Sequence, residues 1–174
     1  DVPAETVTRL LTGAGITRFT IVRDPFARFI SAVADKLNVA KAQPPRKALL
    51  AHLGLPAEYS FHTEEVAEIF LGDAAAHHLD KHWRPQRACI AYGLMPYTAI
   101  GRAENWEHDF AAISARIFGT PAPQVDTRER YGHRTPPAYH RAADTPRLRR
   151  LVADLYAEDY EMLAEISESG LLPA

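Results

Sequence analysis

The apolar residues of this chain follow two spacings, and each spacing predicts one type of element. Residues 16–22 are almost continuously apolar toward their end, where Phe19, Ile21 and Val22 lie. A short run of this kind is typical of a strand covered on both faces, as in a parallel sheet. A second strand is expected over residues 97–100, ending at Gly101. The chain therefore carries the signal of a small sheet.

The second spacing, three to four residues, predicts helices. Its clearest case begins after Asp24 and Pro25, which suit an N-cap and a first helical residue, and fades near Asn38. Its buried face is expected to hold Phe26, Phe29, Ile30, Val33 and Leu37. The same reasoning predicts further helices over residues 5–11, 47–53, 63–70, 74 to about 83 and 106–117. The helix over 47–53 follows a break at 43–45, the one over 63–70 has Thr63 as cap and Gly72 as end, and the one over 106–117 is closed by Gly119. One long helix is expected from Thr145-Pro146 to Gly170.

Residues 120–144 lack either spacing and are rich in Pro, Arg and His, so we expect a long loop there. A length of 174 residues fits one domain, which we assign to residues 1–174. Strands and helices in this order favour an α/β fold with a small parallel sheet flanked by helices.

Composition narrows the classes of partner. The net charge of −2 gives no overall attraction to nucleic acid, so any anion site must be a local cluster. The single cysteine, Cys89, favours a reducing compartment, and we expect a cytoplasmic protein of bacterial type. No apolar run approaches the ~20 residues of a membrane span. The chain starts at Asp1 without methionine and soon reaches a strand, so we expect it to be N-terminally incomplete.

The junction between the first strand and the next helix is a candidate anion site. The first turn of a helix has N–H groups without intrahelical partners, which favour phosphate. Arg23 lies at the junction, and Ser31 falls about two turns later on the side of the helix away from the apolar stripe. Arginine and hydroxyl groups at such a place suit phosphate. The alternative is purely structural: a helix start, a surface ion pair and a tolerated serine.

Three segments together resemble the family 2 carbohydrate sulfotransferases, of the chondroitin 4-O- and heparan 2-O-type. Val22-Arg23-Asp24-Pro25, Arg28, Ser31 and Ala32 match the pattern V-R-D-P-x-x-R-x-x-S-A. Residues 81–86 (K-H-W-R-P-Q), Cys89 and residues 97–104 resemble H-W-R-P…C…Y-D-F-I-G-K-x-E. Residues 155–161 resemble the closing L-Y-x-x-D-Y/F-E. The resemblance extends over about 145 residues.

The resemblance implies a P-loop nucleotide-hydrolase-like fold and the sulfuryl donor 3′-phosphoadenosine 5′-phosphosulfate (PAPS), which leaves as PAP. It implies that Arg23 and Ser31 bind the donor's 3′-phosphate, that Arg28 is structural, and that the acceptor is a carbohydrate hydroxyl, with no metal. The family's lysine-bearing 5′-phosphosulfate loop has no counterpart here, and Thr98 replaces the usual aspartate.

Histidines and a basic loop supply the remaining candidates. His82 is our candidate general base, and His82 with Arg84 our candidate acceptor contacts, because both lie in the H-W-R-P segment. His78 and His82 are four residues apart, a spacing that also suits zinc on one helix face, although a third ligand is not evident. Arg134, in the basic loop, is a candidate donor contact within a flap; the alternative is a solvated charged loop.

Two other function classes stay open from the sequence. One is a non-catalytic nucleotide- or glycan-binding relative. The other is a nucleotide kinase or hydrolase of P-loop type, which would bind ATP with Mg²⁺. The resemblance adds a second localisation to the cytoplasmic one: if the chain is a fragment of a eukaryotic protein, we expect a membrane-anchored enzyme of the Golgi, as the animal relatives are. The sequence leaves open the acceptor and the oligomeric state.

Overall fold

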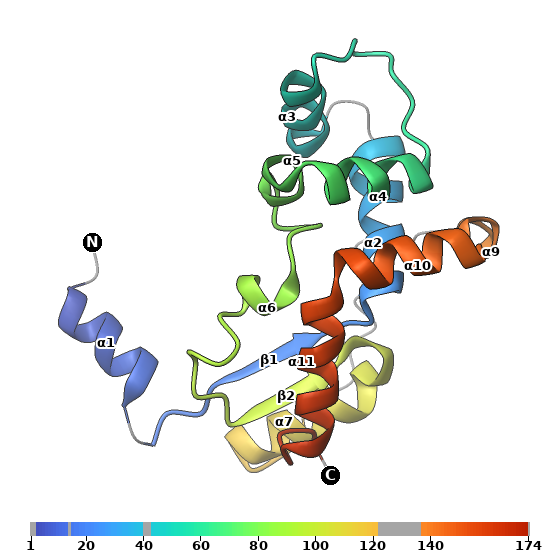
Figure 1. Ribbon diagram of the computed structural model, residues 1–174. Coiled ribbons are helices and arrows are strands. Elements are labelled where there is room, and N and C mark those ends of the chain that lie inside the picture. The colour runs from blue at the N-terminus through green and yellow to red at the C-terminus, as the bar shows by residue number, and fades with distance from the viewer. Residues whose placement is uncertain (1–2, 14, 40–42, 122–136, 174) are drawn as a thin grey trace. The chain divides into compact units, whose positions relative to one another are not determined.

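The computed structural model describes residues 3–13, 15–39, 43–121 and 137–173 (Figure 1). The elements, in chain order, are α1 (Ala4–Thr12), β1 (Phe19–Val22), α2 (Pro25–Ala32), the π-helical η1 (Val33–Val39), α3 (Pro44–Leu53), α4 (Thr63–Gly72), α5 (Ala74–His78), α6 (Gln86–Cys89), β2 (Ala99–Arg102), the 3₁₀ turn η2 (Ala103–Asn105), α7 (Trp106–Phe118), α9 (Pro137–Ala143), α10 (Pro146–Leu155) and α11 (Ala157–Glu168). Contacts divide the chain into two compact units. The first holds residues 1–23, 86–125 and 161–174, and the second holds residues 24–85 and 126–160.

The first unit contains the sheet. Strands β1 and β2 pair in parallel, with Phe19 opposite Ala99 and Val22 opposite Arg102. Ile100 packs with Val22 and with Met162 and Ile166 of α11. The next residue, Gly101, faces the opposite side of the sheet, and there it lies against Ile113 of α7. The sheet is therefore flanked by helices, and the helix-rich α/β fold expected from the sequence is confirmed.

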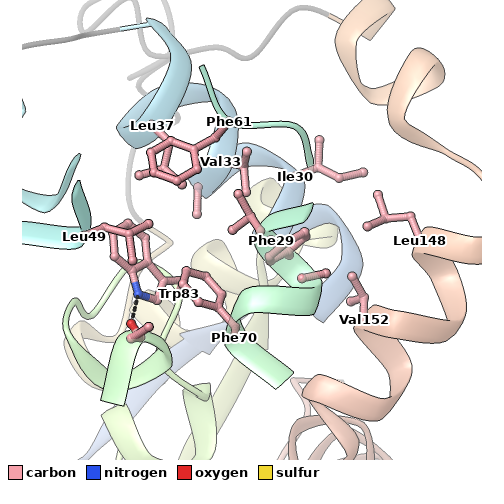
Figure 2. Packing of buried hydrophobic residues seen from close by; sticks show 14 of the residues in the cluster. Phe29, Ile30, Val33, Leu37, Leu49, Phe61, Phe70, Trp83, Leu148 and Val152 are labelled. Carbon is pink, nitrogen blue, oxygen red and sulfur yellow. Dashed lines mark hydrogen bonds between the residues drawn. The ribbon is translucent and has the colours of Figure 1, made fainter. Parts of the chain in front are cut away.

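The second unit is helical around one apolar core. Phe29, Ile30 and Val33 of α2 and η1 are completely buried, and they pack with residues of α3, α4 and α10 (Figure 2). Helix α2 starts as its sequence predicts. The Asp24 side chain accepts a hydrogen bond of 2.7 Å from the Ala27 N–H, and Pro25 stands in the first turn. Burial of this stripe is what holds α2 in place.

Four expectations about helices are wrong. Thr63, predicted as the cap of α4, is its first residue, and His62 is the N-cap. The helix predicted from residue 74 to about 83 ends at His78. The chain folds back there because the buried Trp83 indole N–H donates to the Ala76 carbonyl at 3.2 Å. The long C-terminal helix divides at Tyr156 into α10 and α11. Residues 137–143, predicted as loop, form α9.

None of the helices in the described ranges is long and apolar enough to cross a membrane.

Candidate functional site

Arg23 follows β1 directly, and its backbone is held by the side-chain amide of Gln86. The Arg23 N–H donates to Gln86 Oε1 at 2.9 Å, and Gln86 Nε2 donates to the Arg23 carbonyl at 2.7 Å. An amide side chain offers the same donor and acceptor pair as a neighbouring strand, so Gln86 extends the pairing of β1 by one residue. Gln86 is 7% exposed, which shields both hydrogen bonds from water. The backbone that carries the Arg23 side chain is thereby fixed.

Arg102 ends the neighbouring strand at the same edge of the sheet. The register places Arg102 opposite Val22, the residue before Arg23. The Arg102 N–H donates at 2.7 Å to the buried carboxylate of Asp109, and its guanidinium donates at 2.5 Å to Ser167 Oγ. Carboxyl ends of parallel strands are the usual ligand edge of α/β sheets. An arginine thus lies at that edge on both strands: Arg102 ends β2, and Arg23 directly follows β1.

The N–H groups at the start of α2 have partners within the protein. Pro25 has no N–H, the Ala27 N–H is bonded to Asp24, and the Phe26 N–H is bonded to the Tyr160 hydroxyl. The Arg28 N–H continues the helix by donating to the Asp24 carbonyl at 2.9 Å. Binding of a phosphate at this helix start stays a prediction, and it would rely mainly on side chains.

Ser31, the second predicted 3′-phosphate ligand, lies on α2 in the second unit. Its hydroxyl is 3.4 Å from Nε2 of His140 on α9. Next to His140, the Tyr139 hydroxyl is 3.2 Å from Asn38 Nδ2 and from Thr63 Oγ1, which anchors α9 to the core helices. A serine and an imidazole at this distance can both serve as ligands of one anion. Arg23 and Ser31 belong to different units, and their shared binding of one phosphate stays a prediction.

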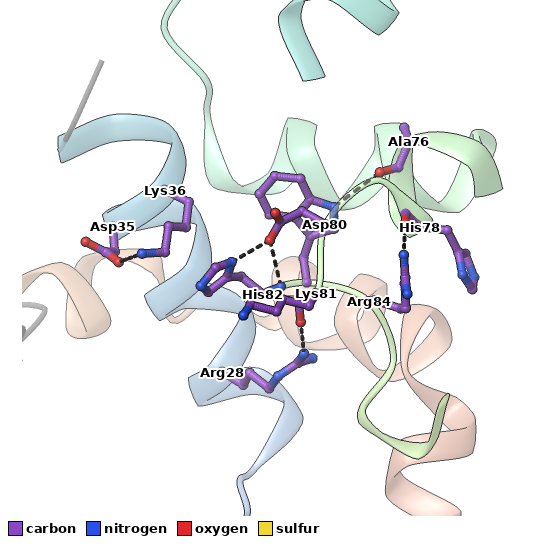
Figure 3. Close-up of polar contacts among 10 residues, drawn as sticks. Arg28, Asp35, Lys36, Ala76, His78, Asp80, Lys81, His82 and Arg84 are labelled. Atoms are coloured by element: carbon purple, nitrogen blue, oxygen red, sulfur yellow. Dashed lines mark hydrogen bonds and ion pairs between the residues drawn. The ribbon is translucent and has the colours of Figure 1, made fainter. Parts of the chain in front are cut away.

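The loop of residues 79–85 carries the predicted acceptor residues and is tied to α2. Arg28 Nη2 donates to the Lys81 carbonyl at 2.8 Å, and the structural role expected for Arg28 stays a prediction (Figure 3). Arg84 Nη2 donates to the His78 carbonyl at 2.6 Å. Arg28 thus ties the loop to α2, and Arg84 ties the end of the loop back to the end of α5.

His82 contacts Asp80 within this loop. One oxygen of Asp80, Oδ1, bonds to His82 Nδ1 and also accepts the His82 backbone N–H at 2.8 Å (Figure 3). Because α5 ends at His78, His78 and His82 do not share a helix face, and that expectation is wrong. The described residues contain no cluster of three or more side chains able to hold a metal ion.

The motifs that look separate in the sequence meet in the second unit. The Tyr156 hydroxyl donates to the Trp83 carbonyl at 2.6 Å, which joins the C-terminal motif to the H-W-R-P segment. The same carbonyl lies 3.0 Å from Nε2 of His77, whose ring stacks on Phe70 with centroids 5.5 Å apart. Burial lowers the pKa of His77 to about 4. His77 is therefore a core residue and stays neutral at pH 7.

A family model described as "Sulfotransferase family", of the family 2 type, matches residues 5–164 of the chain. The chain belongs to the sulfotransferase family. No curated protein and no solved structure matched it. Membership makes this chain a sulfotransferase, an enzyme that transfers a sulfuryl group to an acceptor. The interlocking motifs are thus parts of a sulfotransferase scaffold: Tyr156 and Tyr160 support Trp83 and the start of α2.

The structure places the sulfotransferase's predicted residues unequally. Ser31, His82 and Arg84 are in the second unit and Arg23 is in the first, while Arg134 lies outside the described residues. Sequence reasoning missed the roles of Gln86 and Asp80. Gln86 ends the H-W-R-P-Q segment, and its place in that motif, directly after a proline, could have indicated a specific hydrogen-bonding role. For Asp80 the indication was weaker: it is a carboxylate two residues before the candidate base.

Proposed function

We propose that this sulfotransferase uses PAPS as sulfuryl donor and a carbohydrate hydroxyl as acceptor. The observation that carries the proposal is the fixed backbone of Arg23, the arginine of the V-R-D-P segment, which is held by Gln86 at the carboxyl end of β1. A guanidinium on a fixed backbone can make two parallel hydrogen bonds to a phosphate. Ser31, with His140 beside it, supplies a hydroxyl and an imidazole for the same chemistry.

The reaction requires three tasks of the protein. Arg23 and Ser31 would bind the donor's 3′-phosphate and so orient the nucleotide. A base takes the proton from the acceptor hydroxyl, whose oxygen attacks sulfur in line with the leaving phosphate. Positive groups stabilise the charge that develops on PAP, as in phosphoryl transfer. We assign the base to His82 and acceptor contacts to His82 and Arg84, both on the loop that Arg28 anchors.

Calorimetric titration of PAP and of ADP tests the donor. We expect PAP to bind more tightly than ADP, with Mg²⁺ making no difference, because the 3′-phosphate adds charge-assisted hydrogen bonds. Tighter or Mg²⁺-dependent ADP binding would favour a kinase-like protein and overturn the proposal. Arg23→Ala should weaken PAP by about 10- to 100-fold, since a hydrogen bond to a charged group contributes about 1.5–3 kcal/mol. Arg150→Ala, an exposed arginine on α10, is the matched control.

Transfer of radiolabelled sulfate from PAPS to desulfated polysaccharides tests the acceptor. We expect label in the polysaccharide fraction with wild-type protein and background counts with Arg23→Ala. Selective PAP binding without transfer to any hydroxyl would indicate a non-catalytic relative instead.

A further inference from the structure

We propose that Asp80 positions His82 as the general base, by holding its Nδ1–H so that Nε2 faces the acceptor hydroxyl unprotonated. This inference rests on the proposed function. Its observation is the contact between the Asp80 carboxylate and His82 Nδ1, drawn in Figure 3. A carboxylate can only accept, so a neutral imidazole bonded to it carries its proton on Nδ1. The lone pair of Nε2 is then the one that is open to a substrate proton.

Within the part of the chain that the structure describes, the Asp80 carboxylate bonds to His82 alone. Among the described residues, its hydrogen bonds go to the His82 ring and the His82 backbone N–H. By comparison, the exposed pair of Asp73 and His52, 2.7 Å apart, has a second task, because Asp73 also caps α5 through the Ala76 N–H. An aspartate that bonds to both ends of one histidine fixes the backbone and the ring together, as a positioning residue must.

The loop around the pair is braced on both sides. The Asp80 carbonyl accepts the Arg84 N–H at 3.0 Å, and the Lys81 carbonyl accepts the Arg28 guanidinium at 2.8 Å. Trp83, the residue after His82, is 1% exposed and cannot shift without opening the core. Arg28 comes from α2, which also carries Ser31. The helix with a predicted donor ligand therefore supports the loop with the predicted base.

The His82 side chain is more exposed than the Asp80 side chain, as a base that must reach a substrate requires. The His82 side chain is 37% exposed, whereas that of Asp80 is 21% exposed. The imidazole can therefore reach a substrate while its orienting carboxylate lies deeper. This combination follows the general logic of a carboxylate that fixes the tautomer of a catalytic histidine.

Transfer of the proton and of the sulfuryl group needs no reactant besides PAPS and the acceptor. The acceptor O–H bond breaks and its proton moves to His82 Nε2, giving an imidazolium that Asp80 stabilises. The acceptor oxygen forms a bond to sulfur as the bond from sulfur to the PAP phosphate oxygen breaks, and PAP leaves with that electron pair. His82 then returns its proton to water, which restores the neutral Nδ1–H form.

Nitrogen NMR of the imidazoles tests the pairing without any need for activity. At pH of about 8.5, above the usual histidine pKa, we expect His82 in the Nδ1–H tautomer in the wild-type protein. Asp80→Ala removes Oδ1, the one oxygen that both the imidazole and the His82 backbone N–H contact, so Nε2–H, the tautomer that a free imidazole prefers in water, should become the main one. The His82 signals are assigned by their loss in His82→Gln. An Nε2–H tautomer in the wild type, or no change in Asp80→Ala, would overturn the proposal.

Kinetics with PAPS and desulfated polysaccharide give the second readout. We expect Asp80→Ala to lower kcat at least 10-fold and His82→Gln about 10²- to 10⁴-fold, the usual contribution of a general base, with the KM for PAPS changing less than about 2-fold. Asp73→Asn, in the pair with His52, should retain the wild-type kcat. Wild-type rates in either Asp80→Ala or His82→Gln would refute the pairing. A wild-type protein that fails to prefer PAP would instead refute the proposed function, and the tautomer result would still stand by itself.

Discussion

The backbone of Arg23 is bonded through both its N–H and its carbonyl to one side chain, that of Gln86, over 2.9 and 2.7 Å. The two residues are far apart in the chain but belong to the same compact unit. This relationship gives a physical reason for the glutamine in the K-H-W-R-P-Q segment. The two hydrogen bonds fix the carboxyl end of β1, where Arg23, the predicted phosphate ligand, lies.

Gln86→Glu tests this relationship. The new carboxylate can still accept the hydrogen bond from the Arg23 N–H. It cannot donate to the Arg23 carbonyl, because an oxygen replaces the NH₂ group there. We expect a loss of about 2–3 kcal/mol in the free energy of unfolding by urea denaturation, together with weaker PAP binding. Gln43→Glu is the control, because Gln43 makes no side-chain cap hydrogen bond, and it should change stability by less than about 0.5 kcal/mol. A Gln86→Glu protein with unchanged stability and PAP affinity would contradict the role of the amide.

Arg28→Lys tests the anchor between α2 and the loop of residues 79–85. Lysine keeps the charge but cannot reproduce the planar guanidinium that donates to the Lys81 carbonyl. We expect kcat to fall several-fold while PAP affinity changes less than about 2-fold, because the predicted base moves and the predicted donor ligands do not. Steady-state kinetics with parallel calorimetry would measure both. Arg150→Lys should leave both unchanged, and an equal fall of PAP affinity in Arg28→Lys would assign Arg28 to the donor site instead.

Gly101→Ala tests the close approach of α7 to the sheet. A Cβ at Gly101 would lie 2.6 Å from Ile21 Cδ1 and 3.1 Å from Asp109 Cβ. Since overpacking of this kind usually costs about 1–3 kcal/mol, we expect a loss in that range in thermal or urea unfolding. The control is Gly72→Ala at the end of α4, where a Cβ meets nothing within 4 Å; it should be neutral or stabilising by up to about 1 kcal/mol. Equal stability of the two variants would show that the α7 contact yields easily.

The buried His77 predicts a pH dependence of stability. Its pKa is lowered by burial from 6.5 to about 4, so the unfolded chain binds a proton at pH values where the native protein does not. The contribution of His77 is complete above pH 6.5 and is lost as the pH falls from 6.5 toward 4, by up to about 3 kcal/mol.

Urea denaturation across that pH range measures the effect. His77→Gln should flatten the slope of unfolding free energy between pH 6.5 and 4, at the cost of lower stability at pH 7. A slope unchanged in His77→Gln would mean that another group controls acid unfolding.

Local sequence determined much of this protein. The apolar spacing from Phe26 to Leu37, with Asp24 and Pro25 before it, predicted the start and buried face of α2 correctly, because caps and periodicity act between near neighbours. The same holds for α7, closed by Gly119 with φ of 76°. Both predicted strands formed, with boundaries moved by a few residues. The family resemblance rested on three motifs, and the family match confirmed it.

Tertiary contacts decided the rest. The sequence pattern predicted a helix from Ala74 to about Trp83. In the structure the chain folds back at residue 79, where the Trp83 indole N–H donates a hydrogen bond to the Ala76 carbonyl. The helix break at Tyr156 likewise coincides with a hydroxyl that bonds to the distant Trp83 carbonyl. At the start of α2, the partner of the Phe26 N–H is Tyr160, more than a hundred residues away in sequence. Hydrogen bonds between segments so distant have no local pattern, so only the folded chain shows which polar groups hold the scaffold and which remain for chemistry.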